Sequence, residues 1–370
     1  MDRVNFRQFL LIVFLLAVTM KLFMLPTYMM RISGQDAFIV MLLESGVDML
    51  LLVVVLVIMR MGNGNFFDIL TEAFGKIIAK AATIILALFY LAKLFLLLTE
   101  LRIFFSVSVL YQPLSPLHLL PVLLLLTFIS GKQLCAVGRV SEIVTPLVIV
   151  SMLVLGLLSF NSVDYSNLLP IASGAANAGK GFVSFQMWFG DFVLLLIFSG
   201  RTDGRKRIFF ALIAAVAGLF ALVMFSSMMF ALYSNVPEVL TYGHNISNMT
   251  QYSVSSFQYG RFDLLVFCIW LFGVILSAGI MVTFINRCVN FTVGKDIGIW
   301  TAITCSAAII AATYVFFSAN MVCEFFINYF AVPAMAVQYG FPLALLAALL
   351  TRRIIKRAKA KGVKHEKVRA

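Results

Sequence analysis

The chain has 370 residues, of which 62% are hydrophobic and 12% are charged. This composition excludes a soluble domain with an ordinary core and indicates a protein that crosses a membrane several times. The net charge of +12 does not indicate nucleic-acid binding, because nine of the 28 basic residues lie in the C-terminal tail and most others lie in short loops. Basic residues placed in this way flank the cytoplasmic side of a membrane and attract anionic lipid.

The apolar runs predict an all-α membrane protein, because about twenty apolar residues of helix cross a bilayer. Ten spans are predicted at residues 7–31, 36–59, 77–101, 113–130, 138–159, 177–199, 207–233, 262–287, 297–318 and 330–351. The first span is reached without a small-residue cleavage site, so we expect it to be a retained helix and not a signal peptide. Together the spans predict one ten-helix transmembrane domain, residues 1–351, followed by a basic cytoplasmic tail, residues 352–370.

Lys and Arg residues in the loops predict the orientation of the chain. With the N-terminus inside, the inner segments before the tail hold thirteen basic residues and the outer segments hold four. This bias predicts that both termini are cytoplasmic, in agreement with an even number of spans.

Three segments between the spans are predicted to have structure of their own. NGNFFDILTEAFGKIIAK (63–80) has apolar residues at near-helical spacing, which indicates a short amphipathic helix on the inner surface. On the outer side, segments 161–181 and 233–260 are longer than plain connectors, and we expect the second to form a partly ordered cap.

The first span, which contains AVTMKLFMLPTYM (17–29), carries a charge near its middle. A cation at this depth costs at least about 2.5 kcal/mol on the insertion scale, so Lys21 is expected to have a partner. Pro26 removes a backbone donor and clashes with the carbonyl of Leu22, which loosens the helix beyond the lysine. The run therefore predicts an interrupted helix from Thr19 to Leu22; the alternative is a proline-kinked helix whose lysine pairs with a neighbour.

The sixth span contains a second interruption, in SFQMWFGDF (184–192), where Gln186, Gly190 and Asp191 lie at membrane depth. Interrupted spans in corresponding halves indicate an inverted repeat with a binding site near the midplane. We predict a 5+5 arrangement, with repeat one at about 7–159 and repeat two at about 177–351.

Span two carries Glu44 and Asp48, which lie four residues apart on one helix face. Two carboxylates inside a membrane require a cation, a proton or water. Lys21 is the first candidate partner and Lys93 in span three the second, with a purely structural ion pair as the alternative. Glu100 and Arg102, near the outer end of span three, are expected to lie in the membrane interface.

The sequence contains no pattern that predicts catalysis or metal binding. Its five cysteines and three histidines are scattered, and no nucleophile with a base, phosphate-binding loop or metal-ligand spacing occurs. We expect a protein that is not an enzyme and needs no metal or cofactor.

Several segments are similar to the B subunit of GerA-type spore germinant receptors, in the amino acid–polyamine–organocation superfamily. These segments are FRQFLLIVFLLAVTMKLFMLP, QDAFIVMLLESGVDMLLLVVVL, TELRIFFSVSVLYQPLSPLHLL, GRVSEIVTPLVIVSMLVLGLLSFNSVDYSNLLPI and YGRFDLLVFCIWLFGVIL. The resemblance implies ten helices in a LeuT-type arrangement, a subunit that senses a nutrient, and A- and C-type partner subunits. It also implies the inner membrane of an endospore-forming bacterium.

The chain departs from this family at the first interruption. Relatives have small residues where Thr19, Met20 and Lys21 stand, and often a lysine near Ser277. In LeuT-type folds the first and eighth helices adjoin at a cation site. Our hypothesis is that Lys21 supplies from the first helix a charge that relatives supply from the eighth.

A zwitterionic amino acid needs donors for its carboxylate and acceptors for its ammonium group. Amides near Met20 to Leu22 with Lys21 are predicted to serve the first, and carbonyls near Trp188 with Asp191 the second. The complete predicted ligand set is Thr19, Met20, Lys21, Leu22, Tyr90, Gln186, Trp188, Gly190, Asp191 and Ser277.

The leading functional hypothesis is a receptor subunit that senses a small germinant, expected to be an amino acid. Two alternatives stay open: an amino acid or amine permease of the same fold, and a membrane scaffold that binds no ligand. Fold alone does not separate these functions.

Overall fold

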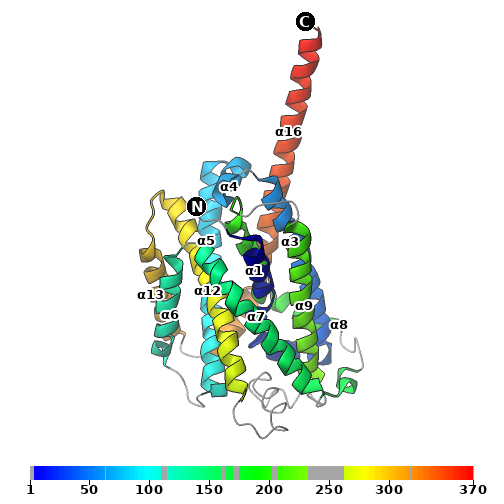
Figure 1. Ribbon diagram of the computed structural model, residues 1–370, viewed down its shortest axis with the longest axis vertical. Helices are drawn as coiled ribbons and strands as arrows, with labels where there is room; N and C mark the ends of the chain where they lie inside the picture. Colours follow the sequence, from blue (N-terminus) through cyan, green and yellow to red (C-terminus); the bar gives the residue numbers. More distant parts are fainter. Residues whose placement is uncertain are drawn as a thin grey trace.

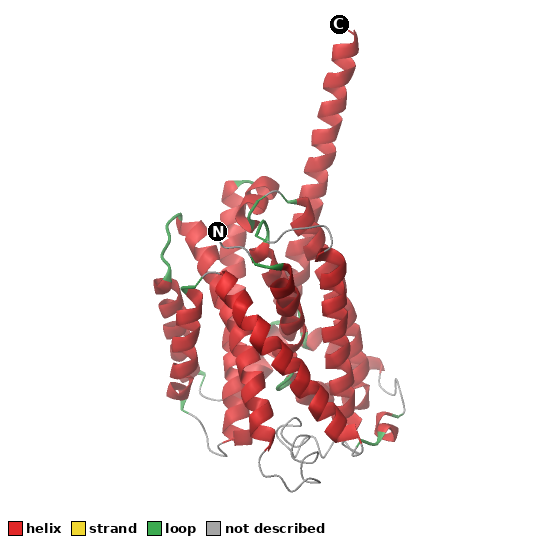
Figure 2. Ribbon diagram, viewed as in Figure 1, coloured by secondary structure: helices red, strands yellow, loops and turns green. Residues whose placement is uncertain are grey.

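The computed structural model describes residues 4–62, 64–109, 115–132, 134–160, 163–169, 175–201, 207–231, 262–316 and 319–369. Within these ranges the protein is made of helices joined by turns and loops, and no strand occurs (Figure 2). The prediction of an all-α protein is therefore confirmed. The outer segment 233–260 lies outside the described residues.

Short 3₁₀ or π turns (labelled η) interrupt or extend many of the helices. The elements are α1 (Phe6–Val18), η1 (Thr19–Lys21), α2 (Leu25–Ser33), η2 (Gly34–Asp36), α3 (Ala37–Met61), α4 (Phe66–Phe74), α5 (Lys76–Phe104), η3 (Phe105–Val109), η4 (Pro116–Leu119), α6 (Leu120–Ser130), α7 (Leu134–Ser159), η6 (Tyr165–Leu168), α8 (Ala175–Ser184), η7 (Gln186–Trp188), η8 (Asp191–Phe198), α9 (Arg207–Ala231), α12 (Phe262–Val293), α13 (Ile299–Val315), α14 (Ala319–Tyr329), α15 (Ala331–Met335), η9 (Ala336–Gly340) and α16 (Phe341–Arg369).

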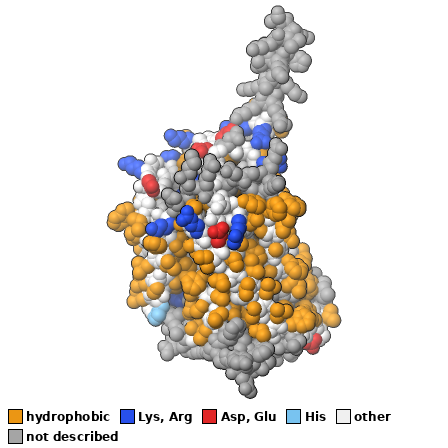
Figure 3. Space-filling model, viewed as in Figure 1, with side chains coloured by type: hydrophobic (Ala, Val, Ile, Leu, Met, Phe, Trp, Pro, Cys, Tyr) orange, Lys and Arg blue, Asp and Glu red, His pale blue; other side chains and the backbone are white. Residues whose placement is uncertain are grey.

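The helices form an elongated bundle with α5 and α12 packed along each other, and α1 lies between α7 and α9 (Figure 1). The N-terminus lies at the end of the bundle from which α16 projects (Figure 1). Apolar side chains cover the middle of the visible face, whereas Lys and Arg gather at the end from which α16 emerges (Figure 3). This distribution is typical of a protein whose middle faces lipid.

Six helical stretches of the described chain are long and apolar enough to cross a membrane, or up to eight if each bent pair is one span. The sequence predicted ten, and the structure supports the coarser statement of a multi-pass helical protein. The difference between eight and ten has a physical cause, because neither the first nor the fourth predicted span is one long helix. The predicted span 7–31 is split into α1 and α2, and α6 has only 11 residues after a 3₁₀ turn.

The chain reverses direction between α2 and α3. Gly34 has φ 60° and ψ −134°, a conformation that glycine adopts more readily than other residues. The ammonium of Lys21 and a carboxylate oxygen of Asp48 are 2.7 Å apart although 27 positions separate the two residues. A continuous helix of that length would separate them by about 40 Å. Helix α3 therefore runs back along α2, and Asp48 returns to the level of Lys21.

Residues 63–80 contain the predicted short amphipathic helix, α4. The predicted helix is confirmed, and part of its apolar face is covered by protein. Phe66, Ile69 and Leu70 are buried, and α4 packs on α5 and α16. The ring of Phe67 stacks on that of Phe291, with 4.9 Å between centroids. Helix α4 therefore joins three helices at one end of the bundle.

The connection between the ninth and tenth predicted spans also differs from the prediction. Residues expected to form a connector fold into α14, which packs against α5. The sequence of this helix, ANMVCEFFINY, mixes polar and apolar residues, so it did not stand out as an apolar run.

Candidate functional site in the two broken helices

The first break separates α1 from α2. Helix α1 ends at Val18, a 3₁₀ turn covers Thr19–Lys21, and residues 22–24 are irregular before α2 begins. Pro26 lies in the first turn of α2, where a residue without an N–H leaves no intrahelical hydrogen bond unmade. The proline therefore marks the start of the second half-helix, and the break lies where the sequence predicted it.

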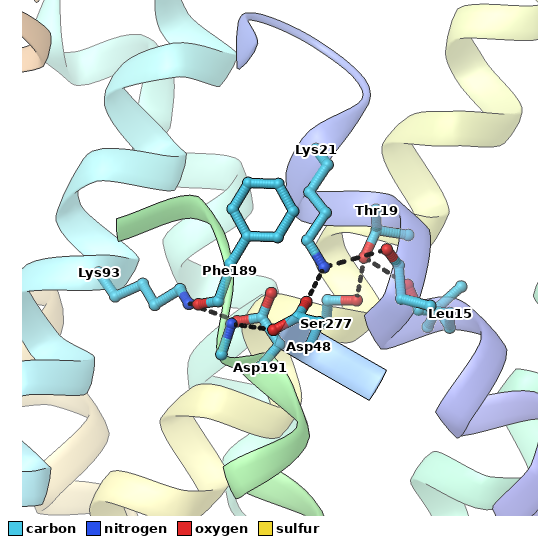
Figure 4. Close-up of polar contacts among 10 residues, drawn as sticks. Leu15, Thr19, Lys21, Asp48, Lys93, Phe189, Asp191 and Ser277 are labelled. Carbon is cyan, nitrogen blue, oxygen red and sulfur yellow. Dashed lines mark hydrogen bonds and ion pairs between the residues drawn. The ribbon is translucent and has the colours of Figure 1, made fainter. Parts of the chain in front are cut away.

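Lys21 is fully buried at this break. Its ammonium donates hydrogen bonds to the carbonyl of Ala17 at 3.2 Å and to Oδ2 of Asp48 at 2.7 Å (Figure 4). It also lies over the ring of Phe189, 4.9 Å from the centroid. A buried cation is tolerated only when it is paired and hydrogen-bonded, and Lys21 meets both conditions.

Thr19 links the first break to α12. Its hydroxyl donates to the carbonyl of Leu15 at 2.9 Å, and its oxygen is 2.6 Å from Oγ of Ser277 (Figure 4). Ser277 and Thr19 therefore lie side by side. Met20 and Leu22, from the same turn, have buried side chains in the apolar core.

The second break lies between η7 and η8, at Phe189 and Gly190, just after a 44° bend that separates residues 177–184 from 186–198. Phe189 is extended, and Gly190 has φ 79°, in the left-handed region that favours glycine. The break frees the N–H of Gly190 and the carbonyl of Phe189. The N–H donates to Oδ1 of Asp48 at 2.8 Å, and the carbonyl accepts from the ammonium of Lys93.

Lys93 also forms an ion pair with Asp191, at 2.7 Å, and both side chains are buried. This pair differs from the prediction, in which Lys93 was a candidate partner for the carboxylates of span two. Lys93 holds both the backbone and the side chain of the second break (Figure 4).

Asp48 contacts both breaks at once. One carboxylate oxygen accepts from Lys21 and the other accepts from the N–H of Gly190. The two contacts are made by the two oxygens of one carboxylate, which a continuous helix, α3, carries. Asp48 is therefore the residue that joins the two broken helices.

Glu44 lies one turn before Asp48, but its described partner is not a lysine. Its Oε1 accepts from Nε2 of Gln186 at 2.6 Å, and this amide also donates to the carbonyl of Phe182. The predicted pairing of Lys21 with Asp48 is present, whereas Glu44 hydrogen-bonds to Gln186 of the second break and forms no ion pair with Lys21 among the described residues. A spacing of four puts both carboxylates on one face, but it does not show which turn faces which partner.

Trp188 lies at the second break with its indole fully buried. Its Nε1–H donates to Oε1 of Glu100 at 2.7 Å, and its ring is near those of Phe185 and Tyr28. Glu100 and Arg102 were expected in the membrane interface, but they are only 1% and 6% exposed. The sequence spacing indicates this burial, because Glu100 follows Lys93 by two helical turns and so lies on the same face of α5.

Tyr90 lies one turn before Lys93 on this face and packs against Phe284 of α12, with 5.0 Å between ring centroids. It is buried, and its hydroxyl has no hydrogen-bond partner among the residues the structure describes. Sequence reasoning missed Gln338, which η9 brings against Gly190. The available signal was weak, namely one amide in the last apolar run.

The site gathers groups that can bind a polar ligand. Two ammonium groups, three carboxylates and freed backbone groups converge here. Within the described ranges, no group of three or more His, Cys, Asp or Glu side chains is placed to hold a metal ion.

These features define a multi-pass helical membrane protein in which two broken helices meet at buried charges. A family model for spore germination proteins matches residues 3–321. The chain therefore belongs to the spore germination protein family. A comparison with curated proteins found no match to the chain.

Proposed function

We propose that this protein is a B-type subunit of a germinant receptor, and that it senses a small nutrient, an amino acid, at the two breaks. The observation that carries the proposal is the double contact of Asp48, with Lys21 on one break and the amide of Gly190 on the other. Any ligand that competes for either contact changes how the two breaks are held together. The site thus provides the differential contacts that a ligand-driven switch requires.

The polar groups of the site match the two ends of a zwitterion. Lys21 and the N–H of Gly190 are donors suited to a carboxylate, and both are held by Asp48. Asp191 and the carbonyl of Phe189 are acceptors suited to an ammonium group, and both are held by Lys93. An amino acid entering here replaces internal pairs with equivalent pairs of its own. Binding and rearrangement are therefore one event, which is how a receptor signals.

The proposed architecture is ten helices in a LeuT-type 5+5 inverted repeat. The breaks at residues 19–24 and 189–190, and the reversal at Gly34, support it. The gathering of basic side chains at the end of the bundle near the N-terminus and α16 supports cytoplasmic termini and contact with anionic lipid there (Figure 3). The proposed setting is the inner membrane of an endospore-forming bacterium, with A- and C-type subunits as partners and no enzymatic step.

The second candidate is a permease for amino acids or amines. The observation that favours it is the pair of broken helices, because transporters use such breaks to bind and release solutes. Both functions need the same ligand site, and only the permease moves the ligand across the membrane.

The test uses the purified full chain in lipid nanodiscs, with binding of each amino acid in a panel measured by calorimetry. We expect at least one amino acid to bind, and Trp188→Ala or Asp191→Ala to abolish or change binding while the protein still inserts. Trp270→Ala is the control for the second break, because Trp270 is also a buried tryptophan but donates to Ser151 on α7, and its ring lies beside Phe23 of the first break, with 6.3 Å between centroids. Binding that is lost equally in all three variants, or absent throughout, would contradict the proposal. Uptake into proteoliposomes would favour the permease.

A further inference from the structure

A second group of buried polar side chains lies beside the breaks and takes no part in the two lysine ion pairs. It comprises Glu44 on α3, Gln186 on η7 and Gln338 on η9, each at most 1% exposed. These residues come from three elements that are far apart in the sequence. Such a meeting of polar groups inside a membrane protein indicates a site and not a packing accident.

Most oxygen atoms of this group lack a partner. Glu44 Oε1 accepts from Gln186 Nε2 at 2.6 Å, but Glu44 Oε2 and Gln186 Oε1 have no hydrogen bond among the described residues. The same holds, within that part of the chain, for both amide atoms of Gln338 and for the hydroxyl of Tyr339. A buried polar atom left unsatisfied costs about 1–3 kcal/mol, so several together indicate a bound species.

Gly190 ties Gln338 to the second break. A Cβ atom added at Gly190 would overlap the side chain of Gln338, so the amide lies directly against the break. The N–H of Gly190 in turn contacts Asp48, one turn after Glu44 on α3. Tyr339 follows Gln338 directly in the chain. Gln338 and Tyr339 lie in a π turn, a helix irregularity that is frequent at functional sites.

Among the described residues, Glu44 has no buried cation of its own. Lys21 pairs with Asp48 and Lys93 pairs with Asp191, so both buried lysines of the cluster are used. Within the described chain, Glu44 is therefore a third buried carboxylate with an amide partner but no cation. Its burial is unfavourable unless a positive species neutralises it.

We propose that Glu44, Gln186, Gln338 and the Tyr339 hydroxyl bind a monovalent metal cation, Na⁺ or K⁺. The available donors are oxygen atoms, which hard cations prefer. One positive charge balances Glu44, whereas a divalent ion would need a second free carboxylate. Both oxygens of Asp48 are already engaged by Lys21 and Gly190.

The cation site shares Gln186 with the predicted ligand set but uses none of the groups that we assign to the two ends of the zwitterion, so it does not depend on the amino acid. A bound cation holds Gln186 and Gln338 together across Gly190, and so stabilises the second break in the bent form seen here. It provides the receptor with a dependence on the ionic medium that exists before any nutrient binds.

The experiment measures thermal unfolding of the full chain in zwitterionic lipid nanodiscs without amino acid. N-methylglucamine chloride is exchanged for NaCl or KCl at constant ionic strength, so only a site that accepts a small cation responds. We expect the unfolding midpoint to rise by about 3 °C or more, with saturation, in one or both salts. Separate Na⁺ and K⁺ titrations identify the ion.

Two variants locate the effect. Glu44→Gln removes the charge and is expected to abolish the cation-dependent shift, whereas Glu142→Gln, at a partly exposed carboxylate on α7, keeps it. If Glu44→Gln does not fold, Gln338→Met retains the charge and removes one ligand oxygen, and should weaken the apparent affinity about tenfold. An unchanged midpoint in the native chain, or an equal shift in Glu44→Gln, would overturn the proposal. A midpoint that follows pH but neither cation would also overturn it, because Glu44 then carries a proton.

Discussion

The two breaks satisfy their buried polar groups in different ways. The first break, at Thr19 to Met24, carries its own lysine, and much of its polar bonding returns to α1, through Ala17 and Leu15. The second break, at Phe189 and Gly190, is held by side chains of other helices: Asp48, Lys93, Glu44 and Glu100 reach it from α3 and α5. The first break is held partly by its own helix and partly by Asp48 and Ser277, whereas the second is held mainly by side chains of other helices.

This difference indicates which half of the site moves. The conformation of a segment held by partners on α3 and α5 changes when any one partner moves. The conformation of a segment bonded partly to its own helix changes less. Asp48 is the exception, because it bonds to both breaks. We therefore expect the second break to respond to ligand, and Asp48 to carry its effect to the first.

The largest expected effect comes from removing the cation of the first break. Lys21→Met leaves Asp48 as a buried carboxylate without its ammonium partner, which should lower the free energy of unfolding by about 3–5 kcal/mol. The measurement is denaturant unfolding in detergent micelles. The double variant Lys21→Met with Asp48→Asn should recover part of the loss, since no buried charge remains. A silent Lys21→Met would contradict the pairing.

Changing the backbone of the second break should have the next largest effect. Gly190→Ala forces a left-handed conformation on alanine and pushes against Gln338, with an expected loss of about 1–3 kcal/mol. Gly46→Ala is the matched control, because Gly46 lies inside α3 with no atom within 4 Å of an added Cβ. That control should be neutral or stabilising, since alanine favours a helix. Equal losses in both variants would remove the special role of Gly190.

Trp188→Phe tests whether the second break depends on its outer partner. The change removes the hydrogen bond to buried Glu100 and should cost about 1–2 kcal/mol, together with a change in amino acid binding. Trp270→Phe removes a similar bond, at 2.8 Å to Ser151, and should reduce stability while leaving binding unchanged. Calorimetry on both variants separates the two roles. An identical binding profile would show that Trp188 is only structural.

The smallest effect is expected at the hydroxyl pair between the first break and α12. Thr19→Val keeps the shape of the side chain but removes its bond to Ser277, with an expected loss of about 0.5–1.5 kcal/mol. Because Lys21 stays paired with Asp48, the contacts of the second break should be unchanged. Faster hydrogen exchange in residues 185–198 of Thr19→Val would contradict this expectation.

The sequence predicted both breaks, because a charge with a following proline and a Gly-Asp pair are conspicuous inside apolar runs. It also predicted Lys21 as a partner for the carboxylates of span two, and Lys21 pairs with Asp48, but it did not predict the other partners. Lys93 reaches Asp191 because of how α5 and η8 pack, and no local pattern encodes that distance. Gln338 is uncharged, and α14 is only moderately apolar, so neither stands out by composition. Patterns along the chain reveal where a helix fails, whereas the pairing across helices depends on the tertiary fold.

The most direct test of the account is hydrogen exchange, followed by mass spectrometry, in the Lys21→Met variant. Lys21 belongs to the first break, but its loss frees Asp48, which holds the amide of Gly190 in the second. We predict faster exchange in residues 185–198 as well as in residues 17–29, with Thr19→Val affecting only the latter. Faster exchange confined to residues 17–29 in Lys21→Met would contradict the claim that Asp48 couples the two breaks.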